Sequence, residues 1–308
     1  MDDAQMRLGF VGLGNLGQHL AASLLRAGFP LTVNDHDEAA AQRLVDAGAV
    51  WASSPAEVAA KSDSVFTCLP SPQAVDEVVS GDSGLLGGMR VGGTWIDSST
   101  NDPHELQRLA ALAADVGVNC LEAPVTGGVH LAASGEITVL VGGDDEAYAA
   151  HLLAFEAIGR RVFHIGPLGS ASTIKVITNM LAFVHLVGAG EALMLAKQAG
   201  LDLAQSFEVI RASSGNSFVH ETESQVILNG SYDIGFTLDL ACKDLGFAND
   251  LGREYGVPLE LAGLVEQTFL RAREEYGGSA WSPMVVKLLE DALGTDLRAP
   301  GFPPRIEA

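Results

Sequence analysis

Residues 7–28, RLGFVGLGNLGQHLAASLLRAG, decide the fold of the first half of this chain. An apolar strand at 8–11 leads into Gly12-x-Gly14-x-x-Gly17, and a helix with leucines at helical spacing follows and ends at Gly28. The first glycine permits a tight turn, the second lets a pyrophosphate approach the backbone, and the third lets helix and strand pack closely. The pattern therefore predicts a dinucleotide-binding turn made by Gly12, Leu13, Gly14, Asn15, Leu16 and Gly17.

A second apolar strand, at 31–34, ends at Asp35, 18 residues after Gly17. A carboxylate in this place binds the ribose hydroxyls of the adenosine half of the cofactor. It also repels a 2'-phosphate, so the sequence favours NAD over NADP as the cofactor. The alternative interpretation is that Asp35 is a turn residue or the cap of a helix that begins near Glu38.

The alternation of strands and helices continues to residue 165. Further strands are predicted at 64–69, 94–97, 118–122, 137–141 and 161–165, with helices at 72–79, 103–114 and 146–158. This order predicts an α/β domain of the Rossmann type with a doubly wound, largely parallel sheet. Ligands of such sheets bind beyond the carboxyl ends of the strands, which gathers segments 69–71, 98–100 and 124–128 around one crevice.

After residue 165 only helical patterns follow, at 203–212, 238–254, 259–276 and 283–293. We therefore expect an NAD-binding domain over 1–166 and an all-helical domain for substrate binding and oligomerisation over 167–308. The second domain begins with the helix that joins the two. The tail from residue 298 is rich in proline and is expected to be extended.

The joining helix carries the most unusual pattern in the second domain. Residues 176–190 contain no charged side chain apart from His185 when it is protonated. This uncharged stretch is shorter than the ~20 apolar residues of a membrane span, so we predict a helix buried inside the protein. Lys175 and Asn179 project from one face of it, because they are four residues apart. A buried lysine requires a partner, and the alternative is an ammonium that reaches solvent from the first turn.

Composition excludes several classes of protein. The chain has 308 residues, 19% of them charged, and a formal net charge of -21. Such an acidic surface repels phosphate backbones and anionic lipid. We therefore expect no nucleic-acid or membrane partner. The three cysteines form no CxxC pair and the histidines form no HExxH motif, so no bound metal is expected. The segment 220–223 is interpreted as a solvated helix start. The first residues lack a signal-peptide pattern, and we expect a cytoplasmic protein.

The chain resembles the β-hydroxyacid dehydrogenases, the family of 3-hydroxyisobutyrate dehydrogenase and tartronate semialdehyde reductase, from residue 8 to about residue 293. The resemblance rests on four blocks in order: GFVGLGNLG at 9–17, EAPVTGG at 122–128 with ASG at 133–135, GPLGSASTIKVITNM at 166–180, and CKDLGFA at 242–248. The resemblance implies that the first block binds the dinucleotide and the second binds the substrate carboxylate. It implies that the third block carries the catalytic residue, Lys175, with Asn179 beside it. Lys243 in the fourth block is implied to lie against the cofactor, and Leu69, Pro70 and Thr100 match positions that contact NAD.

The implied reaction is the NAD-dependent interconversion of a small 3-hydroxy acid, similar to 3-hydroxyisobutyrate, and its semialdehyde or keto acid. Segment 126–128 offers a hydroxyl and backbone N–H groups to a carboxylate, or is an ordinary turn. The family usually has Asp and Ser where this chain has Glu122 and Thr126. His130 either contacts the substrate or is a surface helix residue. The residues expected at the substrate are Thr126, Gly127, Gly128, His130, Asn216 and Phe218.

Three questions stay open at this stage. The enzyme could work mainly as a reductase of a semialdehyde of the tartronate type, because the same groups serve both directions. The scaffold could also be a non-catalytic nucleotide-binding protein, since fold does not fix function. The apolar joining helix and the resemblance together favour a homodimer or homotetramer.

Overall fold

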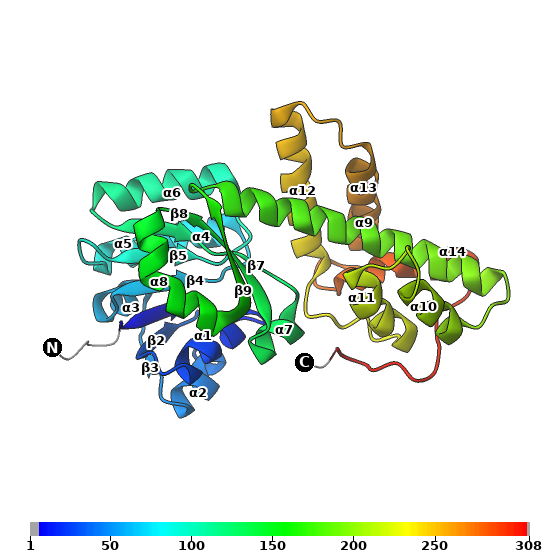
Figure 1. Ribbon diagram of the computed structural model, residues 1–308, viewed down its shortest axis with the longest axis horizontal. Helices are drawn as coiled ribbons and strands as arrows, with labels where there is room; N and C mark the ends of the chain where they lie inside the picture. The colour runs from blue at the N-terminus through cyan, green and yellow to red at the C-terminus, as the bar shows by residue number, and fades with distance from the viewer. Residues whose placement is uncertain (1–5, 307–308) are drawn as a thin grey trace. The chain divides into compact units, whose positions relative to one another are not determined.

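The computed structural model describes residues 6–306, which form two compact units (Figure 1). Unit 1 extends to Lys175 and unit 2 begins at Val176, so the two units meet inside the helix α9 (Ser170–Gln198). The boundary expected from the sequence, residue 166, lies just before this helix. The first turn of α9 belongs to unit 1 because its backbone is hydrogen-bonded to a strand there.

Unit 1 is built on a nine-stranded sheet in the order β3-β2-β1-β4-β5-β6-β8-β7, with β9 paired to β8. Pairings from β3 to β6 are parallel, β8 runs antiparallel to β6 and β7, and β9 is parallel to β8. The strands are β1 (Leu8–Val11), β2 (Leu31–Asn34), β3 (Val50–Trp51), β4 (Ser64–Thr67), β5 (Thr94–Asp97), β6 (Asn119–Glu122), β7 (Val125–Thr126), β8 (Ile137–Gly143) and β9 (Gly159–Gly166). The predicted fold class is confirmed; β3 and β7, two residues each, were not predicted.

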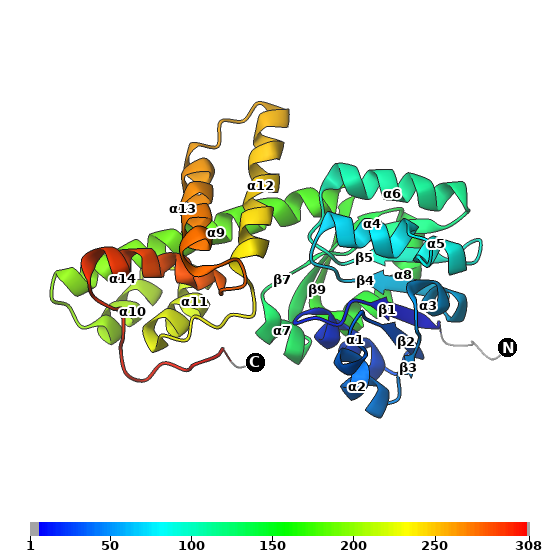
Figure 2. The ribbon, with the colours of Figure 1, turned by 180° about the vertical axis from the view of Figure 1, so that it is seen from behind.

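Helices cover both faces of this sheet, as expected of a doubly wound domain. One apolar core joins the sheet to α1, α2 and α8, and a second joins it to α3, α4 and α6. Figure 2 shows the helices of this unit from behind. The strands β1, β2, β4 and β5 are buried throughout, which explains their continuous apolar runs. The helices of unit 1 are α1 (Gly17–Arg26), α2 (Glu38–Asp46), α3 (Pro55–Lys61), α4 (Pro72–Ser80), α5 (Leu85–Gly88), α6 (Pro103–Asp115), α7 (Val129–Ser134) and α8 (Asp145–Ile158).

Unit 2 is all helical, as predicted. Its core contains Phe183 and Leu186 of α9, Phe207 of α10 and Phe269 of α13. Its other elements are α10 (Leu203–Arg211), α11 (Phe218–Asn229), α12 (Leu238–Tyr255), α13 (Glu260–Tyr276), the 3-10 helix η1 (Ser282–Val286) and α14 (Lys287–Leu293). Of α11 the sequence predicted only the start.

The tail after α14 is held against unit 2 by a buried carboxylate. Glu290 is 3% exposed and accepts hydrogen bonds from the hydroxyl of Tyr232 at 2.5 Å, the N–H of Leu297 at 2.8 Å and the guanidinium of Arg298 at 3.0 Å. This network anchors the start of the proline-rich tail to α14 and to the segment after α11. The extended tail that the sequence predicted is therefore a packed part of unit 2.

The prediction that the joining helix has no solvent face is wrong. Ile177, Leu181 and Leu195 of α9 are 44%, 49% and 72% exposed, and exposed residues recur at helical spacing along this face. The helix is long and apolar enough to cross a membrane by length and composition alone, with a mean hydropathy of 1.5, but only 28% of its apolar window is buried. Composition showed that every face of α9 is apolar; it did not show which faces the rest of the chain covers. We call Ile177, Leu181, Ala192 and Leu195 the exposed α9 stripe.

A buried histidine makes the stability of unit 1 depend on pH. His151 on α8 is 4% exposed, and its Nε2 lies 2.7 Å from the hydroxyl of Ser64 on β4. Its Nδ1 lies 2.7 Å from the carbonyl oxygen of Ala147, so the neutral ring satisfies both contacts. Burial lowers the pKa of His151, an effect that the hydrogen bond to Ala147 opposes.

We expect acid to destabilise the protein through this residue. Because the pKa of His151 is lower in the folded state, the unfolded chain binds the proton more tightly, and stability falls as the pH drops below the ordinary histidine value. The loss attributable to one such group reaches at most ~1.4 kcal/mol near pH 5.5. Melting curves at pH 7.5 and about pH 5.5 should therefore differ less for His151→Gln than for the wild type. The control His36→Gln, whose side chain is 96% exposed, should keep the wild-type difference. An unchanged difference in His151→Gln would contradict the assignment.

Candidate active site

The glycine-rich turn between β1 and α1 has no room for side chains at two of its glycines. Gly12 has a φ of +95°, and a Cβ there would lie 2.4 Å from the carbonyl oxygen of Cys68. A Cβ at Gly17 would lie 2.0 Å from the carbonyl oxygen of Gly12. A Cβ at Gly14 would meet no atom of the described chain within 4 Å. Two glycines therefore serve close packing, and the third leaves space beside the backbone that a ligand can use.

The N-terminus of α1 is suited to an anion. Its N-cap is Leu16, and within residues 6–306 no side chain caps the helix and no acidic residue lies in its first turn. The neighbouring helices α2 and α6, by contrast, are capped by Asp37 and Asp102. The backbone N–H groups of the turn and the positive end of the helix dipole favour a pyrophosphate here. Asn15 is exposed in the turn, whereas Leu13 is 2% exposed, so Leu13 has only its backbone to offer a ligand.

Asp35 follows β2 and is tied to the glycine turn. One carboxylate oxygen accepts a hydrogen bond from the N–H of Leu13 at 2.6 Å, and the other accepts one from the N–H of Asp37 at 2.9 Å. The bond to Asp37 makes a local turn, as one of the alternative interpretations expected. The other alternative is wrong, because the cap of α2 is Asp37, which accepts from the N–H of Ala39. The residues present thus fit a dinucleotide: an open glycine turn, an uncapped helix and a carboxylate beside them.

The ends of β4 and β5 lie next to the turn. Leu69 is within reach of Gly12, since a Cβ at Gly12 would lie 3.0 Å from its Cδ2, and Pro70 beside it is exposed. The hydroxyl of Ser99 accepts from the N–H of Leu69 at 2.9 Å, which links the two strand ends. Thr100 follows Ser99 and is half-buried. The structure thus brings together two of the three segments that the strand order gathered around one crevice.

The segment after β6 carries the residues expected at the substrate carboxylate. Thr126 is half-buried in β7, while Gly127 and Gly128 have φ angles of +127° and +88°. His130 is half-buried in α7, and its ring lies beside Gly128, where a Cβ would come within 3.2 Å of it. Burial lowers the pKa of His130, which favours the neutral ring. Positive φ at two successive glycines fits close approach of a ligand to the backbone.

Glu122, one of the departures from the family pattern, does not face this segment. Its two carboxylate oxygens accept hydrogen bonds from the N–H groups of Gly169, Ala171 and Ser172 at 2.7, 2.8 and 2.9 Å, and from the hydroxyl of Ser172. Glu122 is 1% exposed, and burial raises its pKa against the effect of these donors. A carboxylate at the end of β6 thus caps α9.

Lys175 lies in the second turn of α9 and is 8% exposed, so the interpretation of a lysine whose ammonium reaches solvent does not hold. Its charge acts on Cys68 at the end of β4. Burial raises the pKa of the Cys68 thiol to about 12, the charge of Asp97 adds to the rise, and the charge of Lys175 opposes it. Lys175 is therefore close to the strand end that also borders the glycine turn.

In unit 2 a buried carboxylate holds two of the expected site residues. Asp244 is 0% exposed; one of its oxygens accepts from the side-chain amide of Asn179 at 2.6 Å and the other from the ammonium of Lys243 at 2.7 Å. The ammonium of Lys243 also lies 4.9 Å from the ring centroid of Phe247. The sequence analysis singled out Asn179 and Lys243 but missed Asp244, although it stands next to Lys243 in CKDLGFA.

Two residues at the start of α11 were expected to line the pocket. Phe218 is 54% exposed, and the amide nitrogen of Asn216 donates to Glu221 at 2.5 Å. The amide oxygen of Asn216 and one oxygen of Glu223 are buried without a hydrogen-bond partner in the described part of the chain. Burial raises the pKa of Glu223 to about 8.

The expectation of a solvated helix start at 220–223 is wrong for His220. It is 1% exposed, and its ring nitrogens lie 3.0 Å from the carbonyl oxygen of Phe207 and 3.1 Å from the hydroxyl of Ser224. The acidic neighbours suggested solvent, but this face of α11 packs into unit 2. Among residues 6–306 no group of three His, Cys, Asp or Glu side chains could hold a metal ion.

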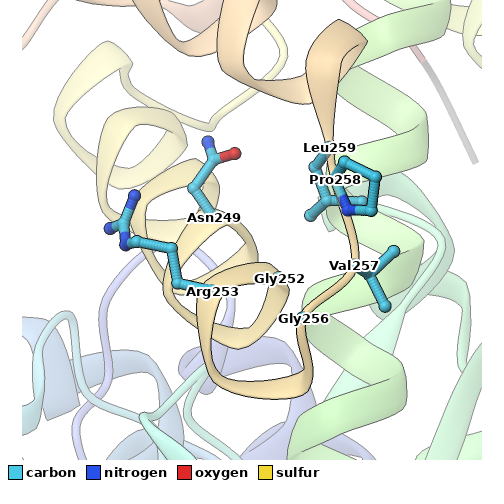
Figure 3. A pocket seen from close by; sticks show the side chains of 7 residues that line it. All are labelled: Asn249, Gly252, Arg253, Gly256, Val257, Pro258 and Leu259. Carbon is cyan, nitrogen blue, oxygen red and sulfur yellow. The ribbon is translucent and has the colours of Figure 1, made fainter.

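A pocket of about 520 Å³ opens at the turn between α12 and α13 (Figure 3). It is lined by Asn249, Gly252, Arg253, Gly256, Val257, Pro258 and Leu259. None of the residues expected to bind cofactor or substrate lines it. We therefore assign it no part in the reaction.

Comparison with known proteins gives matches over almost the whole chain. The family model described as the NAD binding domain of 6-phosphogluconate dehydrogenase matches residues 7–166, and the model described as the NAD-binding domain of NADP-dependent 3-hydroxyisobutyrate dehydrogenase matches residues 169–289. The chain is 31% identical over 96% of its length to 2-(hydroxymethyl)glutarate dehydrogenase of Eubacterium barkeri, of which it covers 98%. It is 36% identical over 91% of its length to L-threonate dehydrogenase of Cupriavidus necator, of which it covers 95%.

A solved structure of 3-hydroxyisobutyrate dehydrogenase from Salmonella typhimurium has the same fold. It superimposes with a TM-score of 0.86 at 32% identity, covering 92% of this chain and all of that one. Fold and matches together define an NAD(P)-dependent dehydrogenase with a Rossmann-type domain followed by an all-helical domain. The chain belongs to the β-hydroxyacid dehydrogenase family, and it is an enzyme that interconverts a 3-hydroxy acid and its carbonyl product. These matches to dehydrogenases argue against the interpretation of the chain as a non-catalytic nucleotide-binding protein.

Proposed function

We propose that this dehydrogenase uses NAD, takes a small 3-hydroxy carboxylic acid similar to 3-hydroxyisobutyrate, and employs Lys175 as its acid/base. The observation that carries the proposal is a buried lysine on a helix whose first turn is tied to the sheet, with its charge close to the end of β4. When bound, the nicotinamide supplies the acceptor or donor of the hydride. The protein has to supply the proton chemistry and the orientation of the substrate.

Lys175 would perform the proton transfer. In oxidation it takes the proton of the substrate hydroxyl, and in reduction its ammonium returns a proton to the developing alkoxide. The positive charge also stabilises that alkoxide. Asn179, four residues further along α9, can orient Lys175 or the reacting oxygen, and Asp244 fixes the Asn179 amide by accepting its N–H.

Segment 126–128 and residue 216 would orient the substrate. Thr126 offers a hydroxyl, while Gly127 and Gly128 offer backbone N–H groups at positive φ, which suits a carboxylate. The buried amide oxygen of Asn216 is an acceptor for a hydroxyl on the substrate, because the rest of this amide is already bonded to Glu221. The methyl group of Thr126, which a serine lacks, narrows this part of the site and favours a small acid.

The carboxylate of Asp35 should make the enzyme select NAD. Asp35 follows β2 and is bonded to the glycine turn, so a 2'-phosphate on the ribose would meet its carboxylate. We expect kcat/KM with NAD to exceed that with NADP by about tenfold or more, equivalent to at least ~1.4 kcal/mol. Asp35→Ser should reduce this preference, whereas Asp37→Asn, in which the cap of α2 survives, should change it much less. Equal or better kcat/KM with NADP for the wild type would refute the assignment.

A screen of short 2- and 3-hydroxy acids tests the substrate class. The acids are oxidised with NAD and the reduced cofactor is followed by its absorbance. We expect 3-hydroxyisobutyrate and its close relatives to give the highest kcat/KM, and a preference for 2-hydroxy acids would contradict the proposal. Running the reverse reaction with the matching semialdehydes separates a dehydrogenase from an enzyme that works mainly as a reductase.

We further propose that the enzyme is a homodimer or homotetramer in which a second copy covers the exposed α9 stripe. Leu181 and Leu195 are 49% and 72% exposed, and burying such side chains stabilises an interface by ~1 kcal/mol or more each. Leu181→Glu should therefore shift the mass measured by light scattering toward the monomer of 32.1 kDa. Leu153→Glu is the control, because Leu153 on α8 is also an exposed leucine, at 73%. A wild type that is monomeric at all concentrations would end this proposal.

A further inference from the structure

The N-terminus of α9 is capped from a strand 47 to 50 residues earlier in the chain, by Glu122. Other capped helices of unit 1, such as α2, α6 and α8, carry their cap on the residue just before the helix. A cap from the adjacent residue satisfies N–H groups but leaves the helix free to move as a body. A cap from the sheet also fixes where the helix lies against that sheet.

The capped turn is the one that leads to Lys175. Ala171 and Ser172 precede Lys175 by four and three residues, so they lie one turn below it on the same side of α9. Their N–H groups bind different oxygens of Glu122, at 2.8 Å and 2.9 Å. Two oxygens that each hold one side of a helical turn restrict its rotation as well as its position along the axis.

The same strand leads directly to the segment proposed to bind the substrate carboxylate. Glu122 is the last residue of β6, and Thr126 to Gly128 follow within six residues. One side chain therefore joins the element that carries the acid/base to the element that holds the substrate. The carboxylate charge also complements the positive end of the α9 dipole.

The site is built for the length of glutamate. Gly142 on β8 lies opposite Glu122 in the antiparallel register, and a Cβ there would lie only 2.2 Å from Oε1 of Glu122. Gly142 thus leaves the space in which the Glu122 carboxylate turns toward α9. An aspartate would end ~1.5 Å short, one carbon–carbon bond, and could not hold the same turn without a shift of α9.

We propose that Glu122 is a positioning residue that sets the place of Lys175 relative to the substrate segment by capping α9 from β6. This inference rests on the proposed role of Lys175. Misplacement of a reacting group by about 1 Å costs up to ~10²-fold in rate, so loss of this cap should act on kcat. Binding of NAD at the glycine turn and Asp35 should be untouched, because neither contacts Glu122.

The first variant is Glu122→Gln, which keeps the length of the side chain but turns one acceptor oxygen into an N–H donor facing the N–H of Ser172. We expect kcat to fall by about 10-fold or more, with the Kd for NAD within about twofold of the wild-type value. Asp144→Asn is the matched control, because Asp144 caps α8 through the N–H groups of Glu146 and Ala147. Because asparagine also caps a helix, this variant should stay folded and leave kcat unchanged.

The second measurement combines Glu122→Gln with Lys175→Ala. If Glu122 acts through Lys175, the substitution should change the residual rate of Lys175→Ala by less than about twofold, so the two effects do not add. A purely structural role would lower the rate by the same factor in both backgrounds. That outcome would overturn the inference, as would a loss of kcat matched by an equal loss of NAD affinity.

Gly142→Ala is a second variant, which tests the same role if Glu122→Gln does not fold. It keeps the carboxylate but pushes it off α9, and we expect the same loss of kcat with NAD affinity retained. Normal kcat in both folded variants would refute the role of Glu122. If Lys175→Ala keeps a normal rate, the proposed acid/base role of Lys175 is wrong. If Lys175→Ala loses its rate but Glu122→Gln keeps it, only the positioning role of Glu122 is wrong.

Discussion

Lys175→Ala should lower kcat by about 10²-fold or more while the affinity for NAD stays nearly unchanged. The rate falls because the segment from Ser170 to Asn179 has no second charged side chain that could act as the acid/base. We propose that the glycine turn and Asp35 hold the dinucleotide, and the substitution leaves both intact. Steady-state rates, an NAD titration and a melting curve for the same protein separate these effects.

Lys197→Ala is the matched control for this substitution. Lys197 lies in the last turn of the same helix and pairs with Asp296 at 3.6 Å, at the surface. Its loss should cost at most about 0.5 kcal/mol of stability and leave kcat alone. Lys175→Arg should rescue little, because a guanidinium does not give up its proton and its planar fork is larger. A folded Lys175→Ala protein with near-normal kcat would remove Lys175 from the mechanism.

Asp244→Ala should destabilise the protein by about 3 kcal/mol and lower kcat as well. The substitution leaves the ammonium of Lys243 and the amide of Asn179 without the buried carboxylate that binds both. The side chain of Lys243 is 18% exposed, so water can partly solvate its charge once Asp244 is removed. The expected loss of stability is therefore at the lower end of the range for buried ion pairs that lose one partner. Urea titration gives the free energy of unfolding, and initial rates on the folded fraction give kcat.

Asp250→Asn on the same helix provides the comparison. Asp250 and its partner Arg253 are 62% and 72% exposed, so their ion pair is screened by water and worth at most about 0.5 kcal/mol. If Asp244→Ala proves as stable as Asp250→Asn, Asp244 does not hold the Asn179 and Lys243 side chains in solution.

Features that depend on neighbours in sequence could be predicted from the sequence. The strand, turn and helix from Leu8 to Arg26 follow from local patterns, in which Gly17 packs against Gly12 and Gly14 leaves the backbone open. The buried parallel strands followed from continuous apolar runs. The change to an all-helical second unit followed from the end of those runs.

Contacts that join distant segments could not be predicted in this way. Glu122 reaches α9 across 47 to 50 residues, and in the sequence it was only a departure from the family pattern. Asp244 lies 65 residues from Asn179, so no spacing rule linked them. The interpretation of α9 as wholly buried failed for a related reason. The composition of a helix shows that a face is apolar. It does not show whether other residues of the same chain pack against that face.

Chemical rescue of Lys175→Ala tests the assignment of the acid/base most directly. Methylammonium has a proton to exchange and is small enough to replace the missing end of the side chain. We expect the rate of hydride transfer to rise with its concentration and with pH, because the free amine is the base in the oxidative direction. Tetramethylammonium has the same charge and no proton, and it should restore nothing. Equal restoration by both cations would show that Lys175 contributes charge alone and would contradict its role in proton transfer.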